Sequence, residues 1–168
     1  MKLSDNFALE EFLVSQTATR MGRDVIARND VIEYLNILCN RVLQPIRDHL
    51  TSIHPDIRMH ISSGYRPVWL NRKLGGSKTS SHCCGEKSKL QEAAADWGIS
   101  GAPEGFTLFD AAREAVTLDL PYDQIIYEGN WIHTGWRQSP RGEILTATFS
   151  KGLFGKVKTT YHNGLIKP

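Results

Sequence analysis

Hydrophobic residues in the first fifty positions recur at the spacing of an amphipathic helix. One apolar stripe, with members three or four residues apart, contains Val31, Leu35, Leu38, Val42, Ile46 and Leu50. A long helix is therefore predicted from Asn29-Asp30 onward, with Asp30 as its N-cap and Glu33 three residues later. Pro45 lies inside the stripe, so a kink or a break is expected there. A shorter helix is predicted around residues 8–14.

The pattern changes to strand periodicity after Pro55. Ile57, Met59 and Ile61 alternate with polar residues, which predicts a strand with one buried face. Further elements are predicted in this order: a short helix over 68–74 ending at Gly75-Gly76, a buried strand over 93–99, a helix from Thr107 with Asp110 in its first turn, and strands within 123–136 and 143–149.

Helices first and mostly strands afterwards indicate an α+β fold, with N-terminal helices packed on a mainly antiparallel sheet. The 168 residues contain no internal repeat and are interpreted as one domain, 1–168. Within it, residues 1–50 form the helical part, 55–150 form the sheet, and 151–168 form a basic tail with four lysines and no carboxylate. We expect this tail to be solvated.

Composition excludes several classes of protein. A net charge of +2 is too small to indicate nucleic acid as a main partner, and no apolar run approaches the roughly 20 residues of a membrane span. The opening residues show no secretory signal. Three cysteines, two of them adjacent, do not form a disulfide framework, which indicates synthesis in a reducing cytoplasm.

Three residues of metal-ligand type stand out: His82, Asp96 and His133. Catalytic zinc takes three protein ligands and leaves a fourth position open. Asp96 follows three alanines on a predicted buried strand, where a carboxylate needs a cation or a hydrogen-bond network. Each residue alone is a weak signal, because a histidine in an apolar strand is more often a hydrogen-bonded core residue. Together they form the candidate zinc site.

Several longer stretches carry a family resemblance. "SGYRPVWLNRKLGGSKTSSH", then "AAADW" and "YDQIIYEGNWIH", resemble the M15 zinc peptidases, which include D-Ala-D-Ala carboxypeptidases and phage endolysin peptidases. "LSDNFALEEFLVSQTATRMG" resembles the opening of their phage and prophage subgroup. The similarity covers most of residues 3–136.

This resemblance implies an M15/hedgehog-like α+β fold with one Zn²⁺ held by His82, Asp96 and His133. It implies hydrolysis of peptide bonds in peptidoglycan, at a terminal D-Ala or inside the stem or cross-bridge. Arg66 matches the family arginine that binds and polarises the substrate near the scissile carbonyl. We expect a monomer that is made in the cytoplasm and acts at the cell wall or periplasm. A phage is one candidate for the genome that encodes it.

The spacing of the first two ligands departs from the family pattern. Six residues usually separate the histidine from the aspartate, whereas thirteen lie between His82 and Asp96. Lys89 occupies the usual aspartate position and is not a ligand in its charged form. Residues 86–92 are therefore interpreted as an inserted loop that bulges into solvent.

The catalytic base is the second departure. The family commonly places an acidic residue three positions before the last histidine, and that position is Asn130 here. Glu128 is the favoured base, provided that a turn or bulge at Gly129-Asn130 directs it to the site. Asp123 and Glu86 are the alternatives.

Other roles stay open at this point. Tyr65, Ser80 and Trp131 are candidates for lining the substrate groove, although packing or turn formation explains each of them as well. Asn130 supports an alternative function, a non-catalytic wall-binding or phage structural module that keeps the fold. A cysteine peptidase with Cys83 or Cys84 as nucleophile and His133 as base lacks a recognisable nucleophile turn. A purely structural metal domain lacks a fourth ligand.

Overall fold

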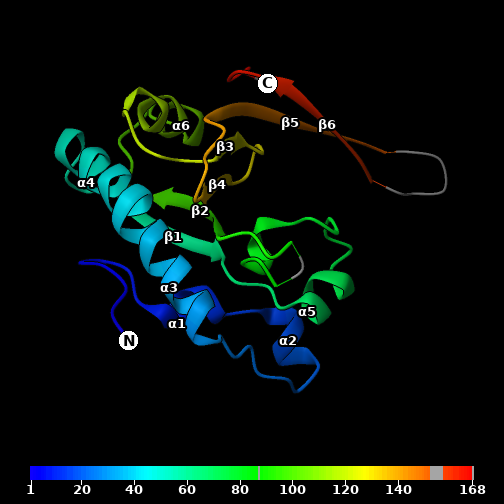
Figure 1. Ribbon diagram of the computed structural model, residues 1–168. Coiled ribbons are helices and arrows are strands. Elements are labelled where there is room, and N and C mark those ends of the chain that lie inside the picture. The colour runs from blue at the N-terminus through cyan, green and yellow to red at the C-terminus, as the bar shows by residue number, and fades with distance from the viewer. Residues whose placement is uncertain (87, 152–156, 168) are drawn as a thin grey trace.

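A computed structural model describes residues 1–86, 88–151 and 157–167 and centres on a six-stranded sheet (Figure 1). The strands lie in the order β1-β2-β4-β3-β5-β6, and every neighbouring pair is antiparallel except β3 and β5. Their bounds are β1 Arg58–Ser63, β2 Glu92–Ser100, β3 Gln124–Tyr127, β4 Ile132–Arg137, β5 Glu143–Lys151 and β6 Val157–Asn163. The predicted α+β class with a mainly antiparallel sheet is confirmed.

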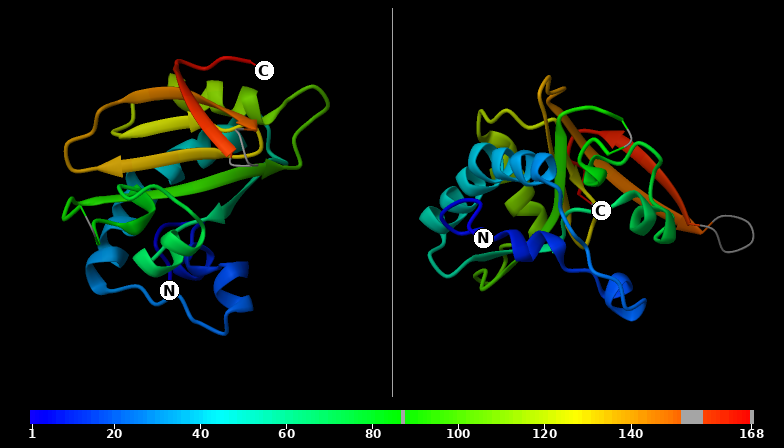
Figure 2. Two further views of the ribbon diagram at one scale, coloured as in Figure 1. Left: turned by 90° about the vertical axis from the view of Figure 1, so that its right-hand side faces the viewer. Right: turned by 60° about the horizontal axis from the view of Figure 1, so that its bottom comes forward.

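Six α-helices accompany the sheet in the described part of the chain. They are α1 Leu9–Leu13, α2 Gln16–Arg20, α3 Asn29–Leu38, α4 Gln44–Ile53, α5 Val68–Lys73 and α6 Leu108–Thr117. Figures 1 and 2 show α3, α4 and α6 along one face of the sheet, while α1, α2 and α5 lie near the end of β1. None of the described helices is both long and apolar enough to cross a membrane.

The long N-terminal helix contains the irregularity expected near Pro45. A π-helical turn, η1 (Cys39–Leu43), joins α3 to α4, and Gln44 N donates to Cys39 O. Pro45 has no N–H for the carbonyl of Arg41, and its ring would clash with that carbonyl in a regular helix. A wider turn just before Pro45 relieves both problems without ending the helix.

The predicted N-cap of this helix is wrong by two residues. The helix begins at Asn29, and the backbone of Arg28 occupies the cap position. Asp30 lies inside the first turn, where its carboxylate accepts from Val31 N at 3.0 Å and pairs with Arg28 Nη2 at 2.8 Å. An aspartate in the first turn is also favoured by the helix dipole, so sequence alone does not separate the two positions.

The two faces of the sheet have different chemistry because side chains alternate along each strand. Trp97, Ile125 and Ile132 are fully buried on the face that packs against the helices. Their neighbours Asp96, Ile126 and His133 point to the opposite face, which carries most of the candidate site residues. Burial of apolar side chains against α3, α4 and α6 thus fixes the strands that present this second face.

The sequence did not predict α2 or β6. β6 lies within the expected basic tail and pairs with β5 from Leu145↔Asn163 to Lys151↔Val157. Residues 152–156 and 168 of that expected tail lie outside the described residues. The strand was missed because its side chains are almost all polar or exposed, so no buried face marks it.

Gly64, which follows β1, makes a close backbone contact with α1. The ladder between β1 and β2 has an irregularity between Ile61 and Ser63, and Gly64 follows directly. A Cβ at Gly64 would lie 2.5 Å from Phe12 Cα, which belongs to the backbone of α1. Tyr65 N donates to Phe12 O at 2.8 Å and holds this close approach.

Gly64→Ala is expected to lower the free energy of unfolding by about 1–3 kcal/mol, because its methyl group overpacks the Phe12 backbone. Urea denaturation measures the change. Gly135→Ala is the matched control, since a Cβ there meets only ordinary contacts of 3.7 Å and more. Equal stability of the two variants would contradict a packing constraint at Gly64.

Candidate metal centre

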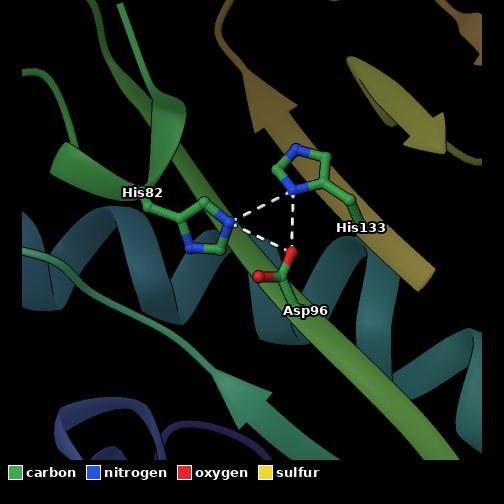
Figure 3. Close-up of side chains that lie close together, drawn as sticks. All are labelled: His82, Asp96 and His133. Carbon is green, nitrogen blue, oxygen red and sulfur yellow. Dashed lines mark hydrogen bonds and ion pairs between the residues drawn. The ribbon is translucent and has the colours of Figure 1, made fainter. Parts of the chain in front are cut away.

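Three side chains converge on the face of the sheet opposite the long helices (Figure 3). His82 Nε2 lies 3.1 Å from Asp96 Oδ1 and 3.1 Å from His133 Nδ1. His133 Nδ1 lies 3.0 Å from Asp96 Oδ1. All three residues are buried, and among the described residues they form the one group of three or more ligand-type side chains with this proximity. The structure therefore brings the predicted ligands together.

Strand register positions two of these residues. Asp96 and His133 are directly opposite each other in the antiparallel pair β2–β4, so their side chains lie on the same face. The small residues Ala94 and Gly135 are the next pair on that face. The alanine-rich segment was predicted as a buried strand, and this prediction is confirmed.

His82 reaches the other two residues from a 3-10 turn, η2 (Ser81–Cys83). Its Nδ1 lies 2.7 Å from Gly64 O, and because a carbonyl oxygen can only accept, Nδ1 carries the proton. Arg66 N donates to His82 O at 2.8 Å. The end of β1 thus orients both the ring and the backbone of His82, as ligand histidines require.

The arrangement of proton-free acceptors in the cluster suits a bound cation. With its proton on Nδ1, neutral His82 presents a bare Nε2 lone pair to Asp96. Burial lowers the pKa of His82 and keeps the ring neutral. Burial alone would raise the pKa of Asp96, but the two histidines outweigh it and lower that pKa. Two proton-free acceptors 3.1 Å apart repel each other unless a positive ion lies between them.

The donor set fits zinc. Imidazole nitrogen and carboxylate oxygen bind Zn²⁺ at about 2.0–2.1 Å, which places tetrahedral ligands about 3.3 Å from one another. The three distances of 3.0–3.1 Å are close to that spacing. Three ligands leave one coordination position open, as in catalytic sites.

The ligands form part of the wall of a cavity of about 520 Å³. Arg66, Ser80, Glu128 and Trp131 line it as well. Arg66 Nη2 lies 3.4 Å from Ser80 Oγ, and Arg66 Nε is buried without a partner among the described residues. A guanidinium in the wall of the cavity suits a substrate oxygen.

Glu128 reaches this cavity because a tight turn separates it from His133. Glu128 N donates to Trp131 O at 3.0 Å, and Gly129 has a φ of +80°. The two-residue turn Gly129-Asn130 places residues 128 and 131 opposite each other, so Glu128 and His133 share a face. The predicted turn is confirmed. Burial raises the pKa of Glu128, as suits a base that works near neutral pH.

Four other candidates lie away from this cavity. Tyr65 is buried in the hydrophobic core. Asp123 is buried against Arg141, whose Nε lies 3.0 Å from Asp123 Oδ1. Glu86 accepts from Val68 N at 2.8 Å. Asn130, the expected position of the acid, is exposed in the turn.

The expected solvent loop at 86–92 is partly wrong. Lys89 is exposed with a φ of +57°, as a residue outside the metal site should be. Glu92, however, is the first residue of β2 and is buried. Its carboxylate accepts from Arg137 Nη2 at 3.1 Å and Ser81 Oγ at 3.3 Å, so it supports the turn that carries His82. Residue 87 lies outside the described residues.

The cysteines do not support a cysteine peptidase. Cys83 and Cys84 are buried, neither lines the cavity of the metal ligands, and no disulfide joins them. Burial raises the pKa of the Cys84 thiol, whereas a nucleophile needs a lowered one.

In the described part of the chain, a mainly antiparallel sheet carries a buried His-Asp-His group that could bind a metal, the kind of site that metal-dependent hydrolases use. The chain belongs to the Peptidase M15 family, whose sequence model matches residues 5–135. A comparison with curated proteins gives no significant match. The M15 peptidases are metal-dependent, and the matched range includes His82, Asp96 and His133.

Asp96→Ala is expected to abolish stoichiometric zinc binding, because it removes the only carboxylate of the three-ligand group. Lys89→Ala is the matched control and should retain zinc. Metal content after dialysis, measured by mass spectrometry, distinguishes them. Equal zinc loss in both variants would remove Asp96 from the ligand set.

Asp123→Asn is expected to lower the free energy of unfolding at pH 7, and this loss should become smaller as the pH falls. Burial opposes ionisation of Asp123, but hydrogen bonds from Arg141 outweigh it and lower the pKa of the carboxyl. Its stabilisation is therefore present above the unfolded pKa of about 3.9 and is lost as the pH falls through the folded value. Urea denaturation at pH 7 and pH 3 measures the difference, with exposed Asp5→Asn as control. A constant difference would contradict this account.

Proposed function

We propose that this protein is a zinc-dependent peptidase that hydrolyses peptide bonds of peptidoglycan at the cell wall. The observation that carries the proposal is the position of His82, Asp96 and His133 in the wall of a cavity that Glu128 and Arg66 also line. Membership of the M15 family supports hydrolysis of a peptide. Both a terminal D-Ala bond and an internal stem or cross-bridge bond fit this proposal.

His82, Asp96 and His133 would hold a zinc ion, which when bound would supply Lewis acidity to a carbonyl and lower the pKa of water toward about 7. Glu128 accepts the proton of the attacking water and returns it to the leaving amine. Its raised pKa suits both roles, since the carboxylate must take up and release a proton. His82 and His133 act as ligands and take no part in the proton transfer.

Arg66 stabilises the negative charge that develops on the carbonyl oxygen. Its backbone N–H is bound to His82 O, so the guanidinium is positioned from the same turn that orients a metal ligand. A donor preorganised in this way needs little rearrangement in the transition state. Ser80 and Trp131 form further parts of the substrate groove.

A wall-binding module without turnover is the second candidate function, and Asn130 is the residue that suggested it. Asn130 is exposed in the β3–β4 turn, whereas Glu128 lines the cavity of the candidate metal ligands. The peptidase proposal therefore has a base available without an acid at position 130. The two functions differ in product release.

Zinc-loaded protein incubated with purified peptidoglycan should release D-Ala or cleaved stem peptides, and a chelator should stop the release. Mass spectrometry of the products identifies the bond. Glu128→Gln is expected to keep its zinc and lose turnover by about 10²–10⁴-fold, because the amide cannot accept a proton.

Asn130→Ala is the matched control for this variant and should retain full turnover, since the side chain is exposed. If Glu128→Gln cleaves as fast as the wild type, Glu128 is not the base. If folded, zinc-bearing wild type releases nothing from walls of several chemotypes, the binding-module function replaces the peptidase.

A further inference from the structure

The β5–β6 hairpin reaches beyond the rest of the sheet (Figures 1 and 2) and has two unlike faces. Cross-strand pairs place Ala147 opposite Tyr161 and Phe149 opposite Thr159. We use the name hairpin strip for Ala147, Phe149, Val157, Thr159 and Tyr161, which share one face, and Lys151, paired with Val157, stands at the outer end of that face. The other face is entirely polar in its described side chains: Thr146, Thr148, Ser150, Lys158, Thr160 and His162.

Ala147 at the inner end of the hairpin strip is buried, but the rest of this apolar face is open to solvent. Phe149 is 47% exposed, Val157 67% and Tyr161 56%. A hairpin with apolar residues on one face and polar residues on the other normally buries the apolar face. Adjoining exposed apolar side chains of this kind mark a binding surface.

The hairpin strip continues the face that carries the metal ligands. Along the sheet, Asp96 is paired with His133, His133 with Ile126, and Ile126 with Leu145 of β5. Because paired residues share a face, the same face passes from the ligands into the hairpin. Leu145, Thr159 and Tyr161 line the same cavity as the ligands.

Aromatic rings extend this connection outward from the cavity. Trp131 lines the cavity beside Glu128, and its ring centroid lies 6.3 Å from that of Phe149. Tyr161, which lines the cavity, adds a phenol hydroxyl that can donate a hydrogen bond. The residues from Trp131 to the strip thus offer rings and hydroxyls, with no charged side chain among the described members.

The chemistry of this surface selects its occupant. Carboxylates and amines of a stem peptide need charged partners, and on this face only Lys151, at the outer end opposite Val157, is of a charged residue type. A sugar ring has an apolar C–H face that suits an aromatic ring and a polar rim that suits hydroxyl groups. N-acetyl groups add a methyl and an amide to the same surface. Uncharged N-acetylated sugars therefore match the strip better than the peptide does.

We propose that the hairpin strip binds N-acetylated sugar rings of the glycan strand to which the peptide substrate is attached. This inference rests on the proposed function and names the part of the substrate that lies beside the metal site. The strip lies outside residues 5–135, the range that the family model matches. Glycan binding would make a wall-linked peptide a better substrate than the same peptide without sugar.

The test uses zinc-loaded full-length protein and a peptide-free oligomer of N-acetylglucosamine, with binding measured by calorimetry. The wild type should bind the oligomer, and Phe149→Ala should weaken binding by about tenfold through loss of ring contact. Phe149→Tyr, which keeps the ring, should bind as the wild type does. Ser150→Ala changes the polar face of the same hairpin and is the matched control. Circular dichroism and zinc content verify the fold of each variant.

Wild-type protein that does not bind the oligomer, or Phe149→Ala protein that binds it unchanged, would overturn the inference. A wild-type dimer that Phe149→Ala converts to monomer in sedimentation would also overturn it, since a second copy would then cover the strip. Cleavage of sugar-free stem peptide is measured in parallel. Cleavage without oligomer binding refutes the glycan inference alone, whereas oligomer binding without cleavage of any wall peptide refutes the peptidase alone.

Discussion

The central interaction of the structure is the contact of one buried carboxylate, Asp96, with two imidazoles, His82 and His133. This cluster has more hydrogen-bond acceptors than protons to share among them. His82 Nδ1 donates a hydrogen bond to Gly64 O, so its Nε2 faces Asp96 as a second acceptor. Water does not solvate these groups, since all three residues are buried. A bound cation converts this repulsion into attraction, which couples the packing of the turn at His82 to metal binding. The same charge then becomes available to a substrate in the cavity.

The positions of the three candidate ligands depend mainly on backbone geometry. Asp96 and His133 meet because β2 and β4 pair in one register, and a slip by one residue would send Asp96 into the helix-packed core. His82 depends on the carbonyl of Gly64, which in turn depends on the absence of a side chain next to Phe12. The N-terminal helices thus act on the site through one close backbone contact, although they contribute no ligand.

Much of this could be predicted from the sequence, and the exceptions have physical reasons. The alternating and helical patterns locate most elements, and the alanines before Asp96 mark a carboxylate on a buried strand. Asp30 was misplaced as an N-cap because a carboxylate suits both the cap and the first turn. Glu92 was assigned to a solvent loop because local charge suggests exposure, whereas burial depends on a distant partner, Arg137. The cavity position of Glu128 required the pairing of β3 with β4, which composition does not encode.

The two faces of the sheet have different roles, and this difference explains where exposed apolar residues occur. The face against α3, α4 and α6 supplies stability through Trp97, Ile125 and Ile132. On the other face the candidate metal ligands, although largely buried, form part of the wall of the cavity. β5 and β6 extend that face past the helices, and Phe149 stays 47% exposed although its ring lies near that of Trp131. Exposed apolar side chains of the hairpin strip lower the stability of the isolated protein. On the proposal of glycan binding, the glycan strand would cover these side chains.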